Sequence, residues 1–165
     1  MFRLSQEEHR LVHGCGTSAS AGSLRERFAS TLPGCAADVL STMFFAEAIP
    51  VKSAETILDE PILCSSVSFS GPVAGVLRIS LSENAAAVLA SDFSGADAPL
   101  EPCIVEQAIG ELANMICGLT LSRIEPRSLF TLSHPESASA PILTDAPDCF
   151  LELPEGLLRL SFRLD

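Results

Sequence analysis

Residues 107–118 read Gln-Ala-Ile-Gly-Glu-Leu-Ala-Asn-Met-Ile-Cys-Gly, and the apolar residues in and just before this stretch recur at helical spacing. At about 100° per residue, these side chains fall in one arc of about 140°, which predicts a helix with a single buried stripe. The predicted stripe consists of Ile104, Val105, Ala108, Ile109, Leu112, Met115 and Ile116. Glu111 and Asn114 lie outside it, one turn apart. Their Cβ atoms are then about 5–6 Å apart, so both side chains can contact one small target.

A glycine on the polar side of this helix needs an explanation. Glycine in a helix interior costs roughly 0.8–1.0 kcal/mol relative to alanine, and Gly110 shares the polar side with Gln107 and Gly118. The close approach of a partner's backbone would account for it. The sequence therefore predicts a contact face formed by Gln107, Gly110, Glu111, Asn114 and Gly118.

The segments around this helix predict an α/β (α+β) domain with antiparallel strand pairs. Residues 64–70 and 75–81 are rich in β-forming residues, and the turn signal Gly71-Pro72 between them predicts a hairpin. Ser82 suits the N-cap of a short helix over 83–91, and Pro102 is favoured at the first position of the Glu111 helix. The other predicted elements are a helix over 34–46 and strands over 128–133, 149–153 and 157–164.

The chain also contains a weak internal repeat. Setting Met43 against Met115 aligns residues 36–43 with residues 108–115, and each copy leads into β-rich segments. Val39 then takes the place of Glu111, and Thr42 takes the place of Asn114. This alignment predicts a pseudo-twofold domain in which one polar site is kept and its twin is filled by other residues. A chance match of two short apolar helices is the alternative.

Size and charge limit the possible functions. The chain of 165 residues and 17.4 kDa fits one domain, and its 47% hydrophobic content argues against disorder. No stretch approaches the roughly 18 uncharged apolar residues of a membrane span, so we expect no membrane insertion. The formal net charge of -11 and the pI near 4.6 repel phosphate backbones. Composition therefore argues against nucleic-acid binding and favours a cationic or metal-carrying protein surface as the partner.

The N-terminal part of the chain predicts an extension. Residues 14–23 are almost all small, as in flexible linkers, so we expect an extension over 1–27 and a folded domain over 28–165. The six cysteines are spread singly without the short spacings of zinc sites, so we expect no metal in this chain. The N-terminus lacks the apolar region of a secretory signal, which favours a cytoplasmic location.

With these elements in order, the chain resembles the CheC/CheX family of chemotaxis phosphatases, and CheX in particular, which has one site per chain. The resemblance covers roughly residues 35–165. Its most specific part is the E-x-x-N helix over 108–118, supported by the strand over 75–81 that leads into the Glu83 helix, and by residues 36–43. It implies a pseudo-twofold fold of helices and an antiparallel sheet, and a homodimer paired through the sheet.

The resemblance also implies an activity and a partner. A CheX-like protein removes phosphate from the aspartyl-phosphate of a phosphorylated CheY-like response-regulator receiver domain, whose own site supplies Mg²⁺, so this chain would bind no cofactor. Phosphoryl transfer is helped mainly by positioning and electrostatics. The implied roles are that Asn114 aims the attacking water and Glu111 docks on a receiver lysine, with Gln107, Gly110 and Gly118 in contact with the partner.

Two positions depart from the family pattern. Gln107 stands where many members have Asp or Ser, and Ser137 stands where a CheC-type pattern has proline. We interpret Pro135, which stands two residues earlier, as the counterpart of that proline.

Other interpretations lead to other functions. The alternative to a phosphatase is a non-catalytic receiver-binding or flagellar-switch-like scaffolding domain. Taken without the resemblance, Glu111 is simply a solvated charge and Asn114 a surface polar residue. No G-x-S-x-G motif occurs, so a serine hydrolase has little support.

Overall fold

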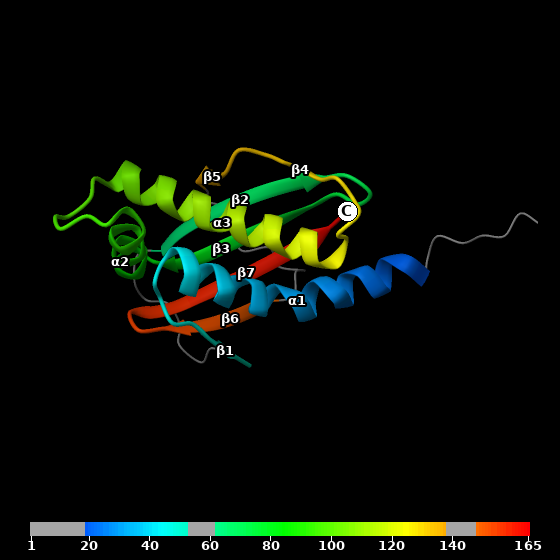
Figure 1. Ribbon diagram of the computed structural model, residues 1–165, viewed down its shortest axis with the longest axis horizontal. Helices are drawn as coiled ribbons and strands as arrows, with labels where there is room; N and C mark the ends of the chain where they lie inside the picture. Colours follow the sequence, from blue (N-terminus) through cyan, green and yellow to red (C-terminus); the bar gives the residue numbers. More distant parts are fainter. Residues whose placement is uncertain (1–18, 53–61, 138–147) are drawn as a thin grey trace, which may run out of the picture.

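The computed structural model describes residues 19–52, 62–137 and 148–165. Three helices are present in this part of the chain: α1 (Ala19–Met43), α2 (Glu83–Ser94) and α3 (Pro102–Ile124). The strands are β1 (Ile49–Val51), β2 (Ile62–Ser70), β3 (Gly75–Ser82), β4 (Thr131–Leu132), β5 (Glu136–Ser137), β6 (Asp148–Leu153) and β7 (Gly156–Leu164). Figure 1 shows α1 and α3 side by side across the sheet, with α2 at one end.

The strands form one antiparallel sheet in the order β1-β6-β7-β3-β2-β4, and β5 also pairs with β2. If β1 is exchanged with β4 and β5, β2 with β6, and β3 with β7, the strand order reads the same from the opposite edge of the sheet. The axis of this exchange passes between β3 and β7, where Leu77 lies opposite Phe162 and Ile79 lies opposite Leu160. The predicted pseudo-twofold α+β architecture is therefore confirmed.

The core lies between the sheet and the two long helices. Alternate side chains of β3 and β7 are fully or almost fully buried, as expected for strands with one face against a core. These are Leu77, Ile79, Leu81, Leu158, Leu160 and Phe162. The ring of Phe28 from α1 lies 4.5 Å from that of Phe162 and 5.9 Å from that of Phe69, between centroids. These contacts hold α1 over the centre of the sheet.

Helix α1 differs from its prediction. It begins at Ala19 and not near residue 34, so it runs through part of the predicted linker and across the predicted boundary between residues 27 and 28. Phe28 and Leu32 are buried before Pro33 is reached. Their burial extends the helix toward the N-terminus, although Pro33-Gly34 resembles a helix start. The rest of the predicted extension, residues 1–18, lies outside the described residues.

The local signals for the hairpin and for α2 are confirmed. β2 and β3 pair on either side of Gly71-Pro72. The Ala85 backbone N–H donates to the Ser82 hydroxyl at 3.2 Å, which is an N-cap contact. Helix α2 ends at Gly95, whose φ of 66° lies in the left-handed region that glycine tolerates.

The sheet edges were not predicted well. The strand expected over 128–133 shrinks to β4, and β1 and β5 were not expected at all. Pro50 lies within β1 and Pro135 lies between β4 and β5. Because proline has no backbone donor, these prolines keep the edge strands short.

Candidate functional site

Helix α3 lies between α1 on one side and a short segment on the other. We call this segment, residues 132–137, the strap; it contains the end of β4, Pro135 and β5. Figure 1 shows the chain from β4 to β5 following α3 at the edge of the sheet. Helix α3 is packed against α1, α2, β2, β3 and β5. We call its remaining side, with Gln107, Glu111 and Asn114, the outward face.

The predicted polar pair lies on this outward face. Glu111 and Gln107 are exposed, and Asn114 is half-buried. The buried stripe is displaced from its prediction, because Ile104 is 40% exposed and Met115 is only half-buried. Ile104 is therefore an exposed apolar side chain in the first turn of α3.

Gly110 does not lie on an open polar face, and this part of the sequence prediction is wrong. The glycine is buried, and a Cβ added to it would stand 3.0 Å from the Pro135 Cβ. The chain's own strap therefore explains why glycine is needed. Gly118 is half-buried, and a Cβ there would meet Leu132 Cδ2 at 4.0 Å, an ordinary contact.

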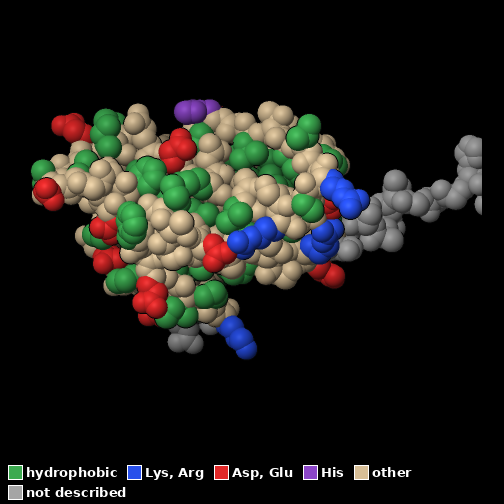
Figure 2. Space-filling model, in the orientation of Figure 1, with side chains coloured by type: hydrophobic (Ala, Val, Ile, Leu, Met, Phe, Trp, Pro, Cys, Tyr) green, Lys and Arg blue, Asp and Glu red, His purple; other side chains and the backbone are tan. Residues whose placement is uncertain are grey.

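A hollow of about 230 Å³ opens between α3 and the strap. Its wall includes Glu106, Gln107, Glu111, His134 and Pro135. Two of these side chains are carboxylates and none is Lys or Arg, so the hollow favours a cationic group. Figure 2 shows acidic side chains over the end of the molecule where α2 lies and α3 begins, while Lys and Arg gather where α3 ends.

Asn114 carries a polar atom without a partner. Its Oδ1 is buried and accepts no hydrogen bond from the described residues. Leaving a buried acceptor unsatisfied costs about 1–3 kcal/mol, so such atoms are rare in folded proteins. Its position next to Glu111 fits a functional site.

Two ion pairs tie α1 to the end of α3. Arg123 Nη2 lies 2.6 Å from Asp38 Oδ2, and Arg27 Nη1 lies 2.9 Å from Glu125 Oε1. Each pair has an exposed partner, so each contributes little stability. Buried side chains of the two helices, and not these pairs, hold α1 beside α3.

The residue alignment of the repeat does not match the exposure of the two helices. Val39, placed opposite the exposed Glu111, is only 6% exposed. Thr42, placed opposite Asn114, is exposed. The α1 copy therefore presents no equivalent pair at the aligned positions.

Other chemistries find little support near this site. Among residues 19–52, 62–137 and 148–165, no group of three or more His, Cys, Asp or Glu could hold a metal ion. Cys117 lies one turn after Asn114, and burial raises the pKa of its thiol to about 12, so it stays protonated at neutral pH. Helix α3 is long and apolar enough to cross a membrane, but more than half of it is buried inside the protein, as in the core helix of a soluble domain.

Comparison with known proteins adds to this picture. Residues 63–144 match the family model described as chemotaxis phosphatase CheX. The structure of chemotaxis protein CheX from Vibrio vulnificus matches with a TM-score of 0.71 at 18% identity, covering 86% of this chain and 98% of that one. CheX from Desulfovibrio desulfuricans matches with a TM-score of 0.66 at 19% identity, over 87% and 99% of the two chains.

A third solved structure is a CheX–CheY–BeF3–Mg²⁺ complex from Borrelia burgdorferi, which matches with a TM-score of 0.65 at 16% identity, over 83% and 97% of the chains. No curated protein sequence matches this chain. The family match includes β2, β3, α2, α3 and the strap, which together contain the polar pair. On this basis, residues 63–144 belong to the family of the chemotaxis phosphatase CheX, and the chain has the fold of the solved CheX structures.

Proposed function

We propose that this protein hydrolyses the aspartyl-phosphate of a CheY-like response-regulator receiver domain, with Asn114 orienting the water and Glu111 docking on the receiver. The observation that carries the proposal is the placement of both side chains on the outward face of α3. The family match and the CheX–CheY complex among the similar structures support the choice of partner.

Asn114 has the chemistry to orient a water. An amide is not a useful base at neutral pH, but its carbonyl accepts a hydrogen bond and can hold a water in line with the phosphorus. Hydrolysis of an acyl phosphate is assisted mainly in this way, by positioning and electrostatics. The unpartnered Oδ1 of Asn114 provides an acceptor that no described group of the protein already uses.

Glu111 has the chemistry to hold the receiver. An exposed carboxylate one turn from Asn114 can pair with a lysine of the receiver site and so fix the helix against the phosphoryl group. In this proposal the Mg²⁺ belongs to the receiver. Glu106 adds a second carboxylate beside the same hollow, which further favours a cationic partner surface.

The rate of phosphate release tests the proposal. A receiver domain phosphorylated with acetyl phosphate in Mg²⁺ should release phosphate at least about tenfold faster when this protein is added at catalytic amounts. Glu111→Lys should weaken association and slow release, because it places a cation against the receiver's lysine and metal. Binding of the receiver without faster release would instead support the non-catalytic, scaffolding alternative.

A further inference from the structure

Three residues form one ridge along α3. Gly110, Asn114 and Gly118 stand at i, i+4 and i+8, so their Cα atoms follow one another on the same side of the helix. Pro135 lies against Gly110, and Leu132 lies against Gly118. The strap therefore runs along α3 and contacts it both one turn before and one turn after Asn114.

Asn114 lies between the two positions where the strap contacts α3. Its neighbours on the ridge have no side chains, so the strap can approach the helix closely, and the Asn114 Oδ1 atom is buried without a partner. The residue as a whole is half-buried. The Asn114 amide is thus partly buried in the stretch of α3 that the strap runs past.

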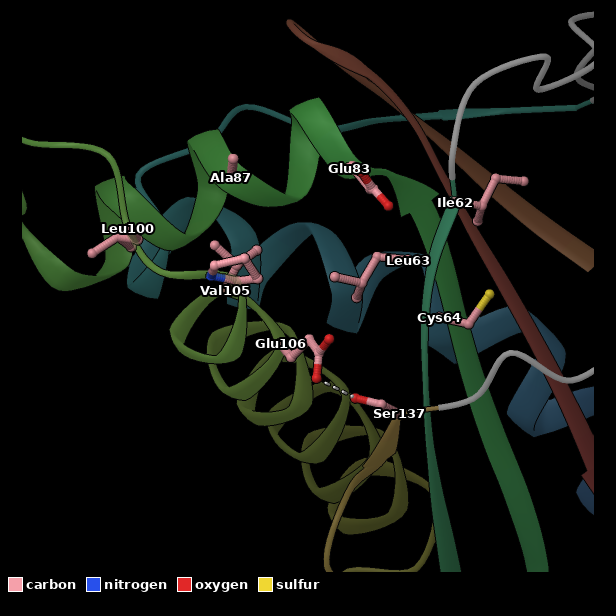
Figure 3. A pocket seen from close by; sticks show the side chains of 10 residues that line it. Ile62, Leu63, Cys64, Glu83, Ala87, Leu100, Val105, Glu106 and Ser137 are labelled. Atoms are coloured by element: carbon pink, nitrogen blue, oxygen red, sulfur yellow. Dashed lines mark hydrogen bonds between the residues drawn. The ribbon is translucent and has the colours of Figure 1, made fainter.

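The strap is held by the sheet and not only by α3. The Ser133 backbone N–H donates to the Ser68 carbonyl at 2.8 Å, and the Ser68 N–H donates to the Ser133 hydroxyl at 3.0 Å. Further along, β5 pairs with β2, and the Ser137 hydroxyl donates to Glu106 Oε2 at 3.3 Å. Figure 3 shows this last contact joining the strap to the first turns of α3.

We propose that the strap is a positioning element for the phosphatase reaction, in which Pro135 and Leu132 confine the Asn114 amide. This inference rests on the proposed function and adds residues to it. Confined in this way, the amide can turn about its last bond but cannot swing away from the outward face. When the receiver and its water dock, the Asn114 amide needs only to adopt the orientation with its carbonyl outward. Little conformational entropy of this side chain is then lost in the reaction.

Gly110 has a matched control in α1. Gly110→Ala and Gly34→Ala add the same methyl group inside a helix, and both favour the helix. At Gly110 the new Cβ would stand 3.0 Å from Pro135, so the strap must shift; at the exposed Gly34 no atom lies within 4 Å and nothing must move. We expect Gly110→Ala to lower kcat about tenfold with KM within about twofold. Gly34→Ala should leave both constants unchanged.

A second substitution tests the contact itself. In a Pro135→Gly background the Cβ atom that stands 3.0 Å from the added methyl group is gone, so adding Gly110→Ala should change kcat by no more than about twofold. Pro135→Gly alone should also lower kcat with KM unchanged, and it serves as the test if Gly110→Ala does not fold. The side-chain NH2 signals of Asn114 in NMR spectra should move in Gly110→Ala and stay in place in Gly34→Ala.

Several results would overturn the inference. Equal kcat values and equal Asn114 signals in the two alanine variants would show that the strap does not confine the amide. A raised KM with unchanged kcat in Gly110→Ala would show that the receiver contacts Gly110 directly. Full turnover by Asn114→Ala, measured alongside, would instead contradict the proposed function, and the NMR comparison would still decide whether the strap confines the side chain.

Discussion

Gly110 is next to Pro135, and this contact changes what a substitution there should do. The sequence alone places the glycine on an open polar face, where a larger side chain would be harmless to folding. In the structure the position is buried, and even a Cβ meets Pro135 at 3.0 Å. A side chain of any size must therefore push the strap away from α3.

We expect Gly110→Leu to destabilise the protein by about 1–3 kcal/mol, because overpacking at a buried site forces neighbouring atoms apart. Urea unfolding followed by circular dichroism measures the change. Gly34→Leu is the control, since Gly34 is an exposed helical glycine with nothing within 4 Å of its Cβ position. That variant should be at least as stable as the wild type. Equal stability of the two variants would show that Pro135 does not restrict Gly110.

Cys117 predicts how stability depends on pH. Its thiol has a pKa of about 12 in the folded protein against 9.0 for an unperturbed thiol, because burial disfavours the thiolate. The contribution of this pKa shift to the free energy of unfolding is fully present below pH 9 and is lost as the pH rises from 9 toward 12. Wild type should lose about 2 kcal/mol more than Cys117→Val between pH 8 and 10.5. Parallel urea curves for both proteins at the two pH values measure the difference, and identical losses would contradict it.

At the scale of elements, local signals predicted what lies in the centre of the fold. The hairpin of β2 and β3 follows from two β-rich runs around Gly71-Pro72, and α3 follows from Pro102 and the helical spacing. These signals are sufficient because neighbouring residues determine them. The edge strands β1, β4 and β5 have two or three residues each, and only pairing with a distant strand defines them.

In the candidate site, too, the features that neighbouring residues determine were predicted and those that distant contacts determine were not. The exposure of Glu111 follows from helical periodicity, and the sequence predicted it correctly, whereas Asn114 is half-buried. The burial of Gly110 could not be predicted, since it depends on the path of the strap across α3. A proline near the expected family position is the only signal that pointed to the strap. The start of α1 was missed because the burial of Phe28 depends on contacts with Phe69 and Phe162, which are distant in the sequence.

The N-cap of α2 gives a prediction for one element. The Ser82 hydroxyl accepts from the Ala85 N–H at 3.2 Å and is buried, so no water can replace it easily. Ser82→Ala should lower the free energy of unfolding by about 1 kcal/mol. Ser41→Ala, at an exposed position of α1, is the control and should change it by less than about 0.5 kcal/mol. Urea denaturation distinguishes the two, and an unchanged midpoint for Ser82→Ala would argue against the cap.

For the whole molecule, dimerisation stays a prediction. β1 pairs with β6 on one side only, and it ends the sheet in the described part of the chain. Ile49 in this strand is 57% exposed, so a second copy packed against the edge would bury it. Light scattering at micromolar concentration should give about twice the chain mass of 17.4 kDa. Ile49→Lys should shift the protein toward the monomer, and a wild type that is already monomeric would contradict the prediction.

The arrangement of the whole molecule serves one face. The sheet carries α3, and α1 and the strap lie on either side of this helix, so that packing holds the face with Glu111 and Asn114 in place. A face held in this way suits a reaction that depends on positioning. The central claim is therefore that Asn114 promotes hydrolysis while contributing little to docking.

The most direct test compares kcat and KM for dephosphorylation of a receiver by the wild type and by Asn114→Ala. The alanine variant keeps Glu111 but loses the carbonyl that holds the water, so kcat should fall at least tenfold, about 1.4 kcal/mol of barrier, with KM little altered. If Asn114→Ala keeps full turnover, the phosphatase mechanism is contradicted and the protein is better described as a receiver-binding module.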